Sequence, residues 1–137
     1  MSGNLISNEV KDFVFHSIDS AEQLDILLLL HSDVHKKASI KEISDFLRST
    51  PTSIEKRILN LIQQNLLVSA GEGAQTKYAF HFENEAALKV VSQLAEVYKS
   101  HRYGILEIIF SPLKKSRDFA DAFKISGSKD PKGGRNG

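Results

Sequence analysis

Residues 39–63 have the sequence SIKEISDFLRSTPTSIEKRILNLIQ, and this stretch decides the fold. Its first four residues form a capping box, in which Ser39 and Glu42 bond the free N–H groups at the start of a helix. Thr50 and Pro51 end that helix and start a second one, because threonine suits the N-cap and proline suits the first helical position. The stretch therefore predicts two helices joined by a tight turn.

The second of these helices, which we place at residues 51–64, has one apolar face. The spacing i, i+4, i+7 and i+8 is occupied by Ile54, Ile58, Leu61 and Ile62. This spacing is typical of a helix that packs one side against a core. Two helices around a tight turn have the layout of a helix-turn-helix.

After Asn65 the pattern changes to one that predicts a β-hairpin. Leu66–Ser69 predicts a strand, Gly71–Gln75 predicts a turn, and Thr76–Phe82 predicts a second strand with strict alternation of apolar and polar residues. A two-stranded hairpin directly after the second helix of a helix-turn-helix is a wing. We therefore expect a mainly α-helical fold with a small β-hairpin, a winged helix-turn-helix.

Two helices are predicted before the helix-turn-helix. Residues 7–16 predict a short N-terminal helix capped by Ser7. Ser20 and Gln23 form a second capping box, and the helix that follows contains LDILLLL at residues 24–30. Because this segment is apolar nearly all round, we expect it to be buried on most sides at the centre of the core.

The helical pattern returns after the wing. One helical face is apolar over residues 87–98, and Ile105–Phe110 continue the apolar content. The stretch 84–110 predicts either one helix about 40 Å long, at ~1.5 Å per residue, or a helix kinked or split near Gly104 and the polar residues 99–102. We favour pairing of this long helix with its copy in a homodimer over packing against its own domain.

These patterns divide the chain into three regions. Residues 1–82 form the winged helix-turn-helix domain with its short N-terminal helix, and residues 83–125 form a C-terminal helical dimerisation region. In the second region Phe119 and Phe123 stand one helical turn apart. Residues 126–137 have the composition of a disordered tail.

The composition is that of an ordinary globular chain. The 137 residues are 41% hydrophobic and 26% charged and include no cysteine. The lack of cysteine excludes disulfides and thiolate metal sites and fits a reducing cytosol. The longest apolar run, Ile26–Leu30, is far below the ~18 residues that a membrane span needs, and the N-terminus has no secretory signal pattern. We therefore expect a cytoplasmic protein that does not enter membranes.

Charge is unevenly distributed along the chain. Residues 1–100 carry 10 Lys and Arg against 13 Asp and Glu, a net charge of −3. Residues 101–137 carry 8 against 4, a net charge of +4. A domain that grips phosphates usually presents a clear basic patch. The first hundred residues lack such a surplus, which counts against strong DNA binding.

The order of helix, helix, turn, helix, hairpin and helix resembles the winged helix-turn-helix superfamily of MarR-like and related bacterial transcription regulators. This resemblance covers about residues 20–82. Three stretches, Asp19–Leu30, Tyr98–Phe110 and Phe119–Phe123, resemble a group of little-characterised bacterial winged-helix proteins. The resemblance implies a dimeric regulator that binds double-stranded DNA.

If the resemblance extends to function, helix 51–64 is the recognition helix and enters the major groove of DNA. Side chains able to contact bases or phosphates occupy the face that we place opposite the core. They are Thr52, Ser53, Lys56, Asn60 and Gln63, with Arg57 on the flank. Lys56 or Arg57 would contact guanine, and Asn60 or Gln63 would contact adenine. An ordinary polar outer face of a helix is the alternative explanation.

Two further basic residues are candidate phosphate contacts. Lys41 lies at the start of the first helix of the pair, and Lys77 is the one basic residue of the wing. The wing tip carries Glu72, which repels phosphate, whereas MarR-like wings often carry Arg or Lys near the tip. This departure supports a second hypothesis. The chain would then be a winged-helix module that binds a protein partner, such as a component of the transcription machinery, and no DNA.

No pattern in the sequence indicates an enzyme, a cofactor or a metal site. His31 and His35 have the i, i+4 spacing of two metal ligands, but no third ligand is close in sequence. The favoured explanation is a histidine that interacts with the last carbonyls of a helix. Ser53 and Lys56 match a four-residue motif of penicillin-binding enzymes whose companion motifs are absent.

Overall fold

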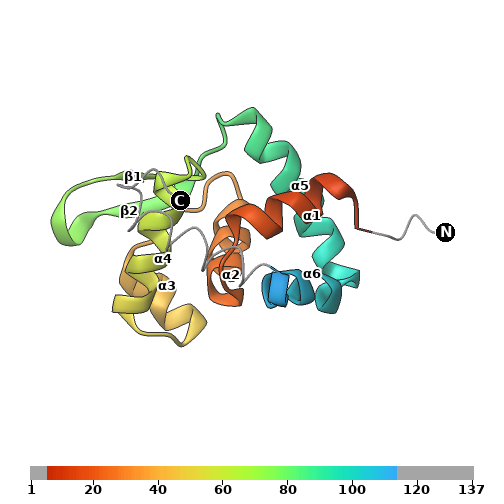
Figure 1. The fold of residues 1–137 in the computed structure, drawn as a ribbon. Helices are drawn as coiled ribbons and strands as arrows, with labels where there is room; N and C mark the ends of the chain where they lie inside the picture. Colours follow the sequence, from red (N-terminus) through yellow and green to blue (C-terminus); the bar gives the residue numbers. More distant parts are fainter. Residues whose placement is uncertain (1–5, 114–137) are drawn as a thin grey trace, which may run out of the picture.

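The computed structural model describes residues 6–113, which form six α-helices and one pair of strands. The elements in chain order are α1 Asn8–Ser17, α2 Ala21–His31, α3 Ile40–Leu47, α4 Pro51–Gln63, β1 Leu67–Ala70, a 3₁₀ turn at Gly73–Gln75, β2 Lys77–Phe80, α5 Glu85–Ser100 and α6 Arg102–Ile109. The expected class, mainly helical with a small hairpin, is confirmed. Figure 1 shows α3, α4 and the hairpin on one side of α2, and α1, α5 and α6 on the other, a winged helix-turn-helix with added helices.

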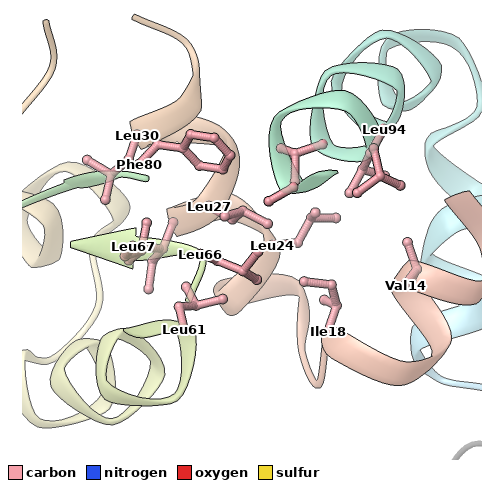
Figure 2. Packing of buried hydrophobic residues seen from close by; sticks show 14 of the residues in the cluster. Val14, Ile18, Leu24, Leu27, Leu30, Leu61, Leu66, Leu67, Phe80 and Leu94 are labelled. Carbon is pink, nitrogen blue, oxygen red and sulfur yellow. The ribbon is translucent and has the colours of Figure 1, made fainter. Parts of the chain in front are cut away.

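The core is organised around α2, as the sequence predicted. Leu24, Ile26, Leu27 and Leu30 are all fully buried. Different faces of this helix contact α4, β2 and α5. In Figure 2 the side chains of α2 lie among those of α4, the hairpin, α1 and α5. A helix with no free face needs the apolar composition that residues 24–30 provide.

The starts of the helices lie where their capping residues predict. Ser7, Ser20, Ser39 and Thr50 each accept a hydrogen bond from a backbone N–H of the first turn. The capping box of Ser39 is complete. That of Ser20 is not, because the Gln23 side chain accepts from the N–H of Asp19 at 2.6 Å. Ser20 therefore caps the helix as predicted, whereas the Gln23 side chain bonds to Asp19 and not to the backbone N–H of Ser20.

The wing is a short hairpin whose second strand is attached to the segment before α3. Leu67 pairs with Phe80 and Ala70 with Lys77 in the antiparallel register. Gly71 has φ 95°, and a Cβ there would lie 2.7 Å from the carbonyl oxygen of Gln75, so the turn requires glycine. Two backbone hydrogen bonds, of 3.0 and 2.8 Å, join Ala38 to Tyr78 of β2. This attachment fixes the wing relative to the helix-turn-helix.

The prediction of a single helix over residues 84–110 is wrong, and the alternative prediction of a split helix is confirmed. The helix ends at Ser100, His101 has φ −125° and ψ 41°, and α6 then begins at Arg102. Both segments pack against α1, which buries Ile105 and Ile109 of α6. A straight continuation of α5 would carry these two isoleucines away from α1, and their burial favours the break.

The apolar face of α5 is largely covered within the chain. Ala87, Val90, Val91 and Leu94 are buried against the described part of the same molecule. Packing against its own domain, the less favoured of the two predicted arrangements, therefore accounts for this face. Exposed apolar side chains remain at Tyr103, Phe110 and Leu113, in and after α6.

The predicted helix containing Phe119 and Phe123 and the predicted disordered tail at 126–137 lie outside the described residues. Within residues 6–113, none of the helices combines the length and apolar character needed to cross a membrane.

Candidate nucleic-acid interface

The helix α4 has a buried face, a polar flank that faces α2, and a face exposed to solvent. Ile54, Ile58 and Leu61 are fully buried. Ser53, Arg57 and Asn60, on the flank toward α2, are partly buried. Apart from Pro51 at the helix start, the exposed side chains are Thr52, Glu55, Lys56, Leu59 and Gln63, which we call the α4 stripe. Of the predicted base-contacting residues, the structure thus brings Thr52, Lys56 and Gln63 together on one exposed face.

Ser53 and Arg57 do not lie on that exposed face, because both bond to a carboxylate of α2. Glu22 accepts hydrogen bonds from the hydroxyls of Ser49 and Ser53 and from Arg57 Nε, the last at 3.2 Å. Burial by itself would raise the pKa of the Glu22 carboxyl. The hydrogen bonds from Ser49, Ser53 and Arg57 outweigh it, so this pKa lies below its ordinary value of 4.5. Glu22 therefore holds α4 and the turn before it against α2, and it neutralises Arg57.

Asn60 is also on the flank toward α2, which contradicts its predicted exposed position. Its Oδ1 accepts from Gln23 Nε2 and from Gln64 Nε2, each at 2.7 Å. Gln64 donates further to the carbonyl of Ser17 at 2.8 Å. Gln23 is only 1% exposed, so its amide depends on these protein partners. Asn60 thus completes a polar network between α1, α2 and α4, and its amide oxygen is already used.

Glu55 and Leu59 were not among the residues predicted from the sequence, and the structure exposes both beside Lys56. Of the four predicted apolar positions, Ile54, Ile58 and Leu61 are fully buried, but Ile62 is only partly buried, so the buried face is rotated slightly toward Leu61. This small rotation turns Asn60 inward and Leu59 outward. The helical spacing from Thr52 to Glu55 and Leu59, i, i+3 and i+7, was the available signal.

The two basic residues predicted outside α4 are both exposed and both ion-paired. Lys41 Nζ lies 3.0 Å from Asp45 on the same helix. Lys77 Nζ lies 2.9 Å from Glu42 Oε1, which also accepts from the backbone N–H of Ser39 at 2.8 Å. The hydrogen bond from Ser39, followed by the interaction with Lys77, lowers the pKa of Glu42. Glu42 therefore joins the start of α3 to the wing.

A groove of about 400 Å³ separates α3, the start of α4 and the wing. Its lining includes Ser39 and Lys41 from α3, Pro51 from α4, and Thr76 and Tyr78 from the wing. The groove brings the candidate residue Lys41 to the same side as the first turn of α4. The helix start and the wing are thus presented on one surface, although they are distant in sequence.

His31 is partly buried and has contacts with α5 and with β2. Its Nε2 lies 3.0 Å from Ser92 Oγ, and its ring centroid lies 5.1 Å from that of Phe80. Burial lowers the pKa of the His31 imidazole below its ordinary value. The contact with Ser92 differs from the predicted interaction with helix carbonyls. Among residues 6–113, no group of three or more His, Asp or Glu side chains is placed to hold a metal ion.

No family model matches the chain, and no curated protein matches its sequence. Solved structures do match. HlyU from Vibrio cholerae N16961 aligns with TM-score 0.54 and 18% identity over 70% of this chain and 100% of that one.

Two further solved structures cover more of the chain. MepR of S. aureus, solved as a complex with DNA, aligns with TM-score 0.53 and 12% identity over 89% of this chain and 90% of that one. The adhesin competence repressor AdcR of Streptococcus pyogenes aligns with TM-score 0.51 and 19% identity over 82% and 80%. At these identities the likeness shows the fold alone, a winged helix-turn-helix.

Proposed function

We propose that the protein is a DNA-binding transcription regulator that places α4 in the major groove. The observation that carries this proposal is the division of α4 into a flank hydrogen-bonded to α2 and an exposed face, the α4 stripe. The fastened flank holds the helix in a fixed orientation. The stripe leaves Thr52, Lys56 and Gln63 accessible, and these side chain types bond to bases or phosphates.

Two further observations support the proposal. The groove between α3, α4 and the wing places Lys41 beside the start of α4, and the wing carries Lys77. MepR, which has a similar fold, was solved bound to DNA. A chromosomal regulator of this kind acts in the cytoplasm, and the proposal assigns no catalytic role to the protein.

The proposal includes a homodimer, whose interface we assign to the end of the helical region. Tyr103 is 83% exposed, Phe110 54% and Leu113 76%, and all three lie in or just after α6. A contiguous apolar patch marks a contact site, whereas single apolar residues are normal on a surface, and the proposal takes these three side chains to form such a patch. The α5 face, which packs inside the chain, is not part of the proposed interface.

The experiment is a titration of the purified protein with random-sequence duplex DNA, at low and at near-physiological salt, with light scattering on the same sample. We expect micromolar or tighter binding by a dimer and a steep loss of affinity with salt. Absence of binding at low salt would reject the proposal.

A second function, binding to a protein without DNA, is favoured by one observation. The predicted basic contacts Arg57, Lys41 and Lys77 are each paired with a carboxylate of the chain itself. Paired charges attract phosphate less than free ones. If the titration shows no DNA binding, co-purification with the transcription machinery is the measurement for this alternative.

A further inference from the structure

The α4 stripe contains two residues whose chemistry a phosphate-binding surface does not explain. Leu59 is 55% exposed, although Ile54, Ile58 and Leu61 on the same helix are fully buried. The core therefore does not use Leu59. Glu55 is exposed one helical turn before Leu59, and no ion pair with another described residue involves it.

Both residues fit the edges of bases in the major groove. An apolar side chain contacts the C5-methyl group of thymine, and a carboxylate accepts a hydrogen bond from the N4 amino group of cytosine. A carboxylate near the DNA backbone would instead be repelled. Glu55 is therefore compatible with DNA only where it meets an amino group, and this requirement restricts which base it faces.

The positions of the two residues within the stripe suit this role. Glu55 and Leu59 are separated by one turn, so their side chains are neighbours on the helix surface. Lys56 and Gln63 lie beside them, and these residues can bond to phosphates or to purines. Polar groups on both sides of an exposed leucine would hold it against a base edge.

We propose that Leu59 and Glu55 determine the base preference of this protein, Leu59 by contact with a thymine methyl and Glu55 by accepting from a cytosine amino group. This inference rests on the proposed function, because it applies only if α4 enters the major groove.

The experiment starts with selection of duplexes from a random pool by the wild-type protein. The selected duplex is then prepared with deoxyuridine in place of each thymine in turn, which removes the methyl group and no hydrogen-bonding atom. Loss of one buried methyl corresponds to about a fourfold loss of affinity. We expect this loss at one thymine or more for the wild type, and no loss at that position for Leu59→Ala.

Glu55→Gln supplies the second measurement. Glutamine prefers adenine, to which it donates and from which it accepts. Selection with this variant should replace cytosine by adenine at one position and leave the other positions unchanged. Val34→Ala is the matched control for Leu59→Ala, because Val34 is 59% exposed and lies in the loop between α2 and α3. The Val34→Ala variant should lose DNA affinity on deoxyuridine substitution as much as the wild type does.

The outcomes separate the inference from the proposed function. If the wild type binds no duplex, both fail. If it selects a sequence but deoxyuridine weakens Leu59→Ala as much as the wild type, or Glu55→Gln selects the same bases, the inference fails and the proposed function stands. Thermal unfolding followed by circular dichroism checks that each variant retains the wild-type fold.

Discussion

The two polar sides of α4 look alike in the sequence and differ in the structure. Ser53, Arg57 and Asn60 lie toward α2 and have protein partners, whereas Lys56 and Gln63 lie in the α4 stripe with no hydrogen bond to another described side chain. A polar residue on a helix can therefore serve stability or recognition. Which of the two it serves depends on the element packed beside it. The difference predicts that the first group determines folding and the second determines DNA binding.

The largest expected effect is on stability, from Asn60→Ala. The substitution removes the oxygen that accepts from Gln23 and Gln64, and it leaves the buried Gln23 amide without that partner. An unsatisfied buried donor costs about 1–3 kcal/mol of the free energy of unfolding, measured by urea denaturation. Gln63→Ala is the matched control from the α4 stripe and should change stability by less than about 0.5 kcal/mol. Equal losses of stability in Asn60→Ala and Gln63→Ala would contradict the difference between the two polar sides of α4.

The next largest effect is expected for Glu22→Gln. At neutral pH it should lower the free energy of unfolding by about 1–2 kcal/mol, because charge-assisted hydrogen bonds are lost. The pKa of Glu22 in the folded protein is lowered from 4.5, so its carboxylate binds protons less readily than in the unfolded chain. Its contribution to stability is therefore present above pH 4.5 and lost as the pH falls through the lowered pKa.

Urea denaturation of the wild type and Glu22→Gln across this pH range measures that contribution. The difference in stability between the two proteins should shrink on acidification. A difference that does not change with pH would show that the charge of Glu22 is unimportant to its hydrogen bonds.

Lys56→Ala tests the exposed side of the helix. We expect about a fivefold loss of DNA affinity, a salt slope shallower by about one, and a change in stability within about 0.5 kcal/mol. Lys89→Ala is the matched control, because it removes the same charge from an exposed position on α5. If the two variants lose affinity equally, overall charge and not the α4 stripe explains the effect.

The smallest effect is a gain, from Glu42→Gln. Glutamine can still complete the capping box of α3, but it no longer pairs with Lys77 as a carboxylate. Lys77 becomes available to phosphate, so we expect about threefold tighter DNA binding. The gain should disappear in the double variant with Lys77→Gln. If the double variant still binds DNA more tightly than Lys77→Gln alone, the gain comes from the lost negative charge of Glu42 and not from Lys77.

Much of the fold could be predicted from the sequence because its signals are local. Capping residues fix the starts of α1 to α4, Pro51 fixes the first turn of α4, and the apolar run at 24–30 marks the buried helix. The break at His101 was only one of two predicted alternatives. Its cause is tertiary, since it depends on where α1 lies.

The candidate site was less predictable for the same reason. Thr52, Lys56 and Gln63 were placed correctly by helical periodicity. Asn60 was not, because its partner Gln23 lies 37 positions away in the sequence, on α2. The pairing of Lys77 with Glu42 joins residues 35 positions apart, and periodicity carries no information about such contacts.

The enclosure of α2 has a consequence for how the molecule opens. Because this helix contacts α4, β2 and α5, none of these three elements can separate from it without exposing apolar surface. The amide hydrogens of Leu27 and Leu30 should therefore exchange with deuterated solvent only when the whole domain unfolds, while those near the wing tip exchange by local opening. Amide exchange in α2, which lies outside the proposed DNA-binding surface, would then measure the global stability of the protein.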